Sequence, residues 1–198
     1  MPTDSAPVGE FGAMTDLATS STRQLWILRH AKAGDAPPGG RDRDRPLTER
    51  GRRDAEALGD ALVADGSPFT TQEFLRPDTA LCSSAVRTVE TADLVLGRLS
   101  DQIPLDSYSS LYEADSDTVL LYLREVEESA RSVLVVGHNP TMFQFIWNMV
   151  VEGSDDRVRL EERDFPTCAL AIVDVAVERW EDVVAGQGKL IGLFEPPY

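Results

Sequence analysis

The stretch LWILRHAKAGD, residues 25–35, decides how the rest of the chain is interpreted. Four apolar residues run directly into Arg29 and His30. A short apolar run is typical of a strand that is covered on both faces, and such strands belong to parallel sheets flanked by helices. Because ligands of open α/β sheets bind outside the carboxyl ends of the strands, an arginine and a histidine at this position predict a functional site.

Further strands and helices alternate along the chain at the spacing of βαβ units. Apolar or β-branched runs predict strands at residues 24–29, 79–84, 132–138, 168–177 and 189–195. Amphipathic or apolar stretches predict helices at residues 47–66, 85–99, 118–129 and 141–153. Thr48 is the expected N-cap of the first helix, and the polar segment 152–166 is expected to be a surface excursion. The sequence therefore predicts an α/β fold with three layers, α/β/α, and a mostly parallel central sheet.

Length and composition favour one domain, since 198 residues with 42% hydrophobic content suit a single core. Residues 1–22 are rich in Pro, Ser, Thr, Ala and Gly without periodicity, which predicts a flexible N-terminal tail before a single domain over residues 23–198. No apolar run is long enough for a membrane span or a secretory signal. We therefore expect a cytoplasmic protein without a membrane partner.

The charge and the cysteines exclude further classes of function. A formal net charge of −15 argues against a nucleic-acid partner, because the phosphate backbone would be repelled. Any anion site must therefore be local. Cys82 and Cys168 match neither a metal-ligand spacing nor a redox pair, so they are expected to be buried thiols of a reducing compartment.

Polar side chains follow three of the predicted strands. They are Arg29 and His30, then Ser83, Ser84 and Arg87, then His138 and Asn139. Two guanidiniums repel a metal cation but bind phosphate oxygens bidentately. A neutral histidine is a nucleophile, and neighbouring arginines disfavour its protonation. The residues predict a phosphate-directed nucleophile, with no metal and no other cofactor.

Five motifs, in this order, carry a family resemblance: LRHAKA, RPLTERGRRDA, SSAVRTVETA, LYEA and VVGHNP. They resemble the motifs of the histidine phosphatase (phosphoglycerate mutase-like) superfamily, and its SixA-type phosphohistidine phosphatases in particular. The resemblance spans about residues 25–140. One departure is Ala31, where the superfamily usually has glycine. The SixA-like branch accepts alanine there, and the added methyl group requires a negative φ.

The resemblance implies a role for each central residue. His30 would attack phosphorus and become transiently phosphorylated, while Arg29 and Arg87 would hold the phosphoryl oxygens. His138 would donate to the same oxygens and stabilise the pentacoordinate transition state. Arg45, just before PLTERG, stands where similar enzymes use an arginine as an extra phosphate contact.

The acid that protonates the leaving group is less well defined. Glu113, in SLYEAD, falls where relatives have this acid, but Asp115 and Asp117 are close by and remain alternatives. Ser83 and Ser84 are expected in a strand-to-helix turn, with either hydroxyl within reach of the phosphate. Other arginines are expected to form a solvated helix face, namely Arg50, Arg52 and Arg53.

The resemblance implies a phosphoric monoester or phosphohistidine hydrolase. Only 25 residues lie between Arg87 and Glu113, and 24 between Glu113 and His138, which leaves no room for cap insertions and predicts an open pocket. An open pocket suits a phosphoryl group on a partner protein, such as a phosphotransfer domain or phosphocarrier, and small phosphoesters are the other substrate class. Two alternative functions are a noncatalytic phosphate-binding module and a phosphoglycerate mutase-like phosphotransferase. The sequence does not indicate the oligomeric state.

Overall fold

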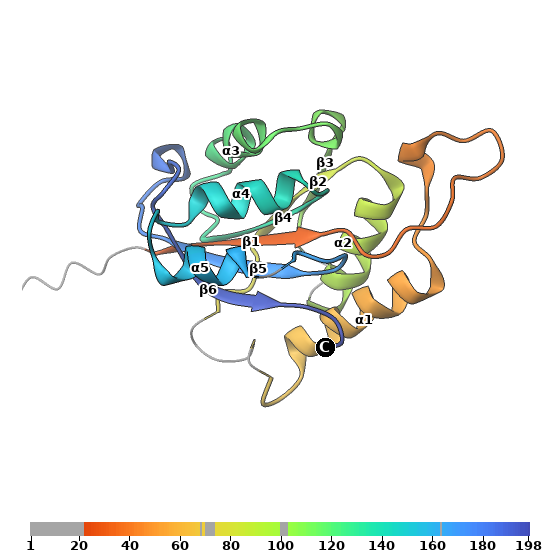
Figure 1. The fold of residues 1–198 in the computed structure, drawn as a ribbon, viewed down its shortest axis with the longest axis horizontal. Helices are drawn as coiled ribbons and strands as arrows, with labels where there is room; N and C mark the ends of the chain where they lie inside the picture. Colours follow the sequence, from red (N-terminus) through yellow and green to blue (C-terminus); the bar gives the residue numbers. More distant parts are fainter. Residues whose placement is uncertain (1–21, 68, 70–73, 100–102, 163) are drawn as a thin grey trace, which may run out of the picture.

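One mixed sheet organises the structure, a computed structural model that describes residues 22–67, 69, 74–99, 103–162 and 164–198. Its strands in these residues follow the order β3-β2-β4-β1-β5-β6 (Figure 1). They are β1 (Arg23–Arg29), β2 (Thr79–Ser83), β3 (Leu105–Tyr108), β4 (Ser132–Gly137), β5 (Leu170–Val175) and β6 (Gly188–Phe194). Strands β3, β2, β4 and β1 are parallel neighbours, whereas β5 is antiparallel to both β1 and β6. The predicted mostly parallel sheet is confirmed.

Helices cover both faces of this sheet (Figure 1). They are α1 (Glu49–Val63), α2 (Val86–Leu99), α3 (Ser116–Arg124), α4 (Thr141–Met149) and α5 (Asp155–Glu161). Successive strand residues point to opposite faces, so β1 contributes to two cores. Trp26 and Leu28 pack with α1 and α2, while Leu25 and Ile27 pack with α3, α4 and α5. The three-layer α/β/α arrangement is therefore confirmed.

Several boundaries differ from the predicted ones. The helix expected at 118–129 ends at Arg124, and the one expected at 141–153 ends at Met149. The polar segment 152–166 carries α5, of which only Leu160 is buried. Strand β3 was not predicted, and short 3-10 helices are present at η1 (Asp42–Asp44), η3 (Ser109–Tyr112) and η4 (Trp180–Asp182).

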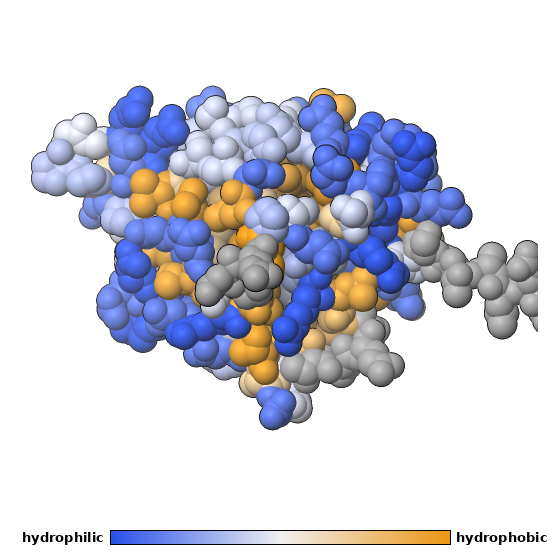
Figure 2. All heavy atoms as spheres, turned by 180° about the vertical axis from the view of Figure 1, so that it is seen from behind, coloured by the Kyte–Doolittle hydropathy of each residue, from blue (hydrophilic) through white to orange (hydrophobic). Residues whose placement is uncertain are grey.

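Surface and boundary features complete the description. The tail predicted for residues 1–22 lies outside the described residues, except for Thr22. Cys82 and Cys168 are both buried and form no disulfide. In the described part of the chain, no helix combines the length and the apolar character that crossing a membrane requires. The face shown in Figure 2 is mostly hydrophilic, with apolar side chains gathered in a narrow strip near the centre and in small patches on either side of it.

The register between β1 and β4 positions the two histidines. Arg29 pairs with Gly137, the last residue of β4, so His30 and His138 follow at the same level of the sheet. The backbone N–H of His30 donates to the carbonyl of Gly137 at 3.0 Å. The carboxyl ends of β1, β2 and β4 thus meet at one edge, beside the loop that leads to α1 (Figure 1).

Candidate active site

His30 is held as a neutral imidazole with one defined tautomer. Its Nδ1 atom lies 2.7 Å from the carbonyl oxygen of Ala31. A carbonyl oxygen only accepts hydrogen bonds, so Nδ1 carries the proton and Nε2 keeps its lone pair. Burial lowers the pKa of His30 to about 4, and the charges of Arg87 and Arg29 act in the same direction. The ring is therefore an unprotonated nucleophile at neutral pH.

The backbone around His30 is fixed from two sides. The N–H of Cys168 donates to the carbonyls of Arg29 and His30, at 3.2 and 3.1 Å. Cys168 has a φ of 67°, and no other non-glycine residue among those described has a positive φ. The N–H of the fully buried Ala31 donates to Thr91 Oγ1 of α2 at 3.0 Å. The negative φ predicted for Ala31 is confirmed.

The start of α1 packs directly against the loop that follows His30. Thr48 caps α1 by accepting from the N–H of Gly51 at 3.0 Å, as predicted. The N–H and the hydroxyl of Thr48 both donate to the carbonyl of Lys32. A Cβ atom at Gly51 would lie 2.2 Å from that same carbonyl oxygen, so this close approach requires glycine.

His138 faces His30, with the ring centroids 5.1 Å apart. Its Nε2 lies 2.8 Å from the hydroxyl oxygen of Ser83, the last residue of β2. Its Nδ1 is buried and has no hydrogen-bond partner within the described residues. Burial, followed by the neighbouring His30 and Arg87, lowers the pKa of His138 to about 3. Both rings are thus neutral when the site holds no anion.

Arg29 extends into the same site with part of its donor set unused. Its Nη1 donates to the carbonyl of Phe165 at 2.7 Å, and Asn139 Nδ2 donates to that oxygen at 3.0 Å. Arg29 Nε is buried without a partner in the described part of the chain. A buried donor without a partner is costly, so Arg29 Nε favours an anionic ligand, and His138 Nδ1 does so when it carries the ring proton.

Arg87 is buried at the start of α2 and contacts a residue that the sequence analysis did not single out. Its Nη1 donates to the backbone carbonyl of Asp42 at 2.8 Å, and its Nη2 to Asp42 Oδ2 at 3.0 Å. The hydroxyl of Tyr112 donates to Asp42 Oδ2 at 2.6 Å, and the Tyr112 ring stands edge-on to His138. The donors Tyr112, Arg45 and Arg87 hold the pKa of Asp42 well below its usual range.

The two weaker site predictions have different surroundings. Arg45 donates from Nη1 to Asp42 Oδ1 at 3.0 Å and from Nε to the carbonyl of Gly34 at 2.7 Å, which brings it to the site through Asp42. Glu113 is exposed and follows Tyr112 directly. Its role stays a prediction. The competing carboxylate Asp115 caps α3 by accepting from the N–H of Thr118, and hydrogen bonds from the side chain and the N–H of Thr118 lower the pKa of Asp115.

The remaining polar candidates have structural partners. Arg50 and Arg53 pair with acidic residues of their own helix, which confirms the solvated face predicted there. Arg52 instead bridges to Glu90 of α2, whose second oxygen accepts from the N–H of Leu47. Ser84 accepts from Arg43 Nη2 at 3.1 Å.

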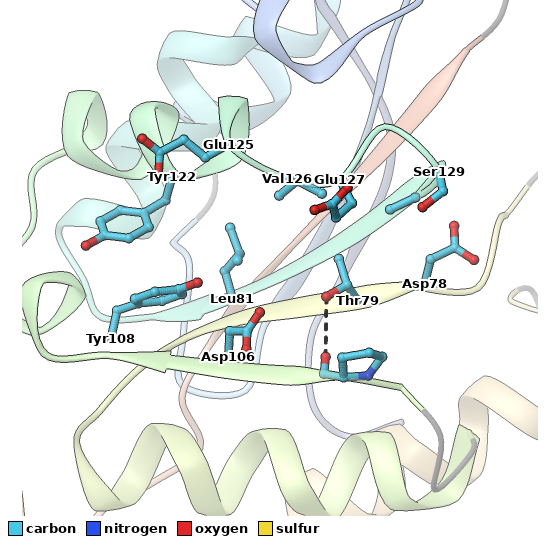
Figure 3. A pocket seen from close by; sticks show the side chains of 12 residues that line it. Asp78, Thr79, Leu81, Asp106, Tyr108, Tyr122, Glu125, Val126, Glu127 and Ser129 are labelled. Atoms are coloured by element: carbon cyan, nitrogen blue, oxygen red, sulfur yellow. Dashed lines mark hydrogen bonds between the residues drawn. The ribbon is translucent and has the colours of Figure 1, made fainter.

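A cavity of about 580 Å³ lies elsewhere, between the end of α3 and strands β2 and β3 (Figure 3). Its lining includes Asp106, Glu125 and Glu127, together with the rings of Tyr108 and Tyr122, whose centroids lie 4.6 Å apart and whose planes are tilted by 46°. Carboxylates repel a phosphoryl group, so this cavity does not compete with the cationic site for that ligand.

Comparisons with known proteins agree with this geometry. Residues 25–119 match the family model described as histidine phosphatase superfamily, branch 1. A solved structure from Nakamurella multipartitia, a candidate phosphohistidine phosphatase SixA, is 29% identical with a TM-score of 0.73, and the match covers 89% of this chain and 98% of that one. A second SixA candidate, from Agrobacterium tumefaciens, is 32% identical with a TM-score of 0.70, covering 88% and 98%.

A relative in Mycobacterium tuberculosis extends the match at the sequence level. This uncharacterised protein is 34% identical over 172 residues, which is 85% of this chain and 99% of the relative. The matched family and the SixA candidates agree with the site, in which a neutral histidine stands beside two arginines and a second histidine. The chain belongs to the histidine phosphatase superfamily, in its SixA-type branch.

Proposed function

We propose that this protein is a metal-independent phosphatase that forms a phosphohistidine on His30 and acts on phosphohistidine carried by a partner protein. Family membership supports phosphatase activity. The observation that carries the mechanism is the contact between His30 Nδ1 and the carbonyl of Ala31 at 2.7 Å, because it leaves the Nε2 lone pair free to attack.

In the first step, the Nε2 lone pair of His30 forms a bond to phosphorus while the bond from phosphorus to the leaving group breaks. The leaving group takes the electron pair of that bond and a proton, from Glu113 or from water. In the second step, a water oxygen forms a bond to the phosphorus of phosphorylated His30 while the bond from phosphorus to Nε2 breaks, and the proton that the water loses leaves with the phosphate or passes to Glu113. Inorganic phosphate departs, and Nε2 recovers its lone pair.

Positive donors stabilise the charge that the phosphoryl oxygens carry in both steps. Arg29 Nε has no partner in the described chain and is available to one oxygen, while Arg87 provides a buried fork for others. When the Ser83 hydroxyl donates to His138 Nε2, His138 Nδ1 carries a proton and donates it to an oxygen. Burial is the main cause of the low pKa of His138, and a phosphoryl dianion beside the ring raises this pKa because it favours the protonated imidazole.

The short connection between α2 and β4 supports a substrate that is itself a protein. Between α2 and β4 the described chain forms only β3, η3 and α3, without a capping insertion. The similar proteins from Nakamurella and Agrobacterium are candidate phosphohistidine phosphatases, which supports the same substrate class here. A small phosphoester is the second candidate, favoured if Glu113 protonates the leaving oxygen.

Rapid-quench labelling tests the proposal. A protein bearing ³²P-phosphohistidine is mixed with the phosphatase, and we expect an acid-labile, base-stable label on His30 with release of inorganic phosphate. His30→Ala should abolish both the label and turnover, whereas His138→Ala should slow labelling. A chelator should leave the rate unchanged, because a site built from arginines does not bind a metal cation.

The same experiment separates the alternatives. A noncatalytic phosphate-binding module would bind vanadate without label or turnover. A mutase-like phosphotransferase would pass the label to an added hydroxyl acceptor rather than to water. Label on any residue other than His30 would contradict the assigned nucleophile.

A further inference from the structure

Asp42 is hydrogen-bonded to the guanidinium of Arg87, which the proposed phosphatase needs for its substrate. Its Oδ2 accepts from Arg87 Nη2 at 3.0 Å and from the Tyr112 hydroxyl at 2.6 Å. Its Oδ1 accepts from Arg45 Nη1 at 3.0 Å. The backbone carbonyl of Asp42 accepts from Arg87 Nη1 at 2.8 Å. Both terminal nitrogens of Arg87 are therefore used by Asp42.

The two partners differ in their freedom to separate. The side chain of Arg87 is 8% exposed, whereas that of Asp42 is 54% exposed. Arg87 stands in the first turn of a long helix, while Asp42 begins the three-residue turn η1 in the loop between β1 and α1. Asp42 is therefore the partner that is freer to move away from this contact.

We propose that Asp42 is a built-in competitor for the phosphoryl group, and that a substrate binds by displacing this carboxylate from Arg87. The inference rests on the proposed function only in that it takes the ligand to be a phosphoryl group. A carboxylate and a phosphoryl group both present oxygens to the same fork of donors. The exchange replaces an internal anion with an external one.

This competition selects for the charge and the oxygen count of the ligand. A ligand with a single charge gains little over the Asp42 carboxylate that it displaces from Arg87 Nη2. A phosphoryl dianion has a third oxygen and a second charge, and two buried nitrogens of the site, Arg29 Nε and His138 Nδ1, have no hydrogen-bond partner among the described residues. Competition from Asp42 thus weakens the binding of singly charged anions more than the binding of phosphoryl groups.

Binding of orthovanadate and inorganic phosphate to the full-length protein, measured by titration calorimetry, tests the inference. In Asp42→Asn the charge is lost and the shape is kept, so we expect both anions to bind roughly five- to tenfold more tightly. Tyr112→Phe removes one donor to Asp42 and keeps the ring on His138, so we expect binding tighter by about two- to threefold.

Asp44→Asn is the matched control. It removes the same charge from the same turn, but Asp44 accepts from the N–H of Arg41 and its bonds do not involve Arg87. We expect its anion affinity to stay within about twofold of the parent protein. A circular dichroism melt of each variant checks that the fold is retained.

Three results would overturn the inference. Weaker binding in Asp42→Asn would mean that Asp42 positions Arg87 for the anion. Equal gains in anion affinity in Asp42→Asn and Asp44→Asn would mean that only the overall electrostatic potential around the site changed. Unchanged binding in Asp42→Asn would mean that no competition exists. Because calorimetry involves no turnover, failure of the proposed function would appear instead as missing label on His30.

Discussion

Ser83 and His138 are joined side chain to side chain across the neighbouring strands β2 and β4, with Ser83 Oγ 2.8 Å from His138 Nε2. Ser83 is fully buried, so its hydroxyl has little freedom to seek another partner. This bond fixes the orientation of the His138 ring and the nitrogen that faces the substrate. Ser83 is therefore a positioning residue for His138.

Replacing Ser83 with alanine should reduce kcat by about 10- to 100-fold, the range typical of lost orienting partners. His30 would still become labelled, but more slowly, because His138 no longer stabilises the transition state. Rapid-quench labelling against time measures this. Ser84→Ala is the control, since Ser84 contacts Arg43 and not a histidine. Equal losses in both variants would exclude the positioning role.

Glu113→Gln should separate substrates by their leaving groups. If Glu113 is the general acid, hydrolysis of alkyl phosphates should slow by roughly 10²–10⁴, while aryl phosphates, whose leaving group needs no proton, should be spared. Steady-state rates on the two substrate types measure the difference. Asp117→Asn removes an alternative carboxylate, also at an exposed position, and should leave both rates unchanged if Glu113 is the acid. An equal loss of hydrolysis rate on both substrates would show that Glu113 is not the general acid.

The two histidines should make the fold sensitive to mild acid. Burial lowers the pKa of His30 to about 4 and that of His138 to about 3, and they are the only histidines of the chain. An unfolded histidine titrates near a pKa of about 6.5, so below that pH the unfolded chain binds more protons than the folded one. Stability should therefore rise with pH between about pH 4 and pH 6.5.

Urea unfolding at about pH 7 and about pH 5 tests this, because most carboxylates titrate at lower pH. We expect the free energy of unfolding to be smaller at the lower pH. In the double variant His30→Gln, His138→Gln the difference between the two pH values should shrink. An unchanged difference would show that other groups cause it.

Gly51→Ala should push α1 away from the loop that carries His30. The new Cβ would lie 2.2 Å from the carbonyl oxygen of Lys32, a contact that needs backbone movement. We expect a loss of about 1–3 kcal/mol in the free energy of unfolding, together with lower kcat. Gly97→Ala in α2 meets no atom within 4 Å and should instead stabilise slightly, because alanine favours helices. Urea unfolding of both variants compares the two.

The central strands and the cationic residues could be predicted because their signals are local. The residues of β1 and β4 are almost all buried, which requires the continuous apolar runs seen in the sequence. Strand β3 could not be predicted, because its sequence, LDSY, is largely exposed at the sheet edge and pairs only with β2. Helix α5 could not be predicted either, because a helix with one buried residue has no apolar face that would show as a periodic pattern.

Asp42 could not be predicted for a different reason. It lies in the alternating segment RDRDR, a pattern typical of solvated charges, and nothing in that pattern indicates a contact with Arg87, 45 residues later. The conformation of η1 depends on tertiary contacts with α2 and η3, and such contacts leave no periodic trace in sequence. Ser83 was assigned to a turn, and its bond to His138 depends on the pairing of β2 with β4.

The pairing of Arg29 with Gly137 limits how this enzyme can vary in length. A single residue inserted into β1 or β4 would turn every following side chain of that strand to the opposite face of the sheet. The rings of His30 and His138 would then no longer face each other. A deletion would do the same. Length changes should therefore be absent from both strands in natural homologues and confined to segments such as 33–41 and 150–164, where an added residue shifts no histidine.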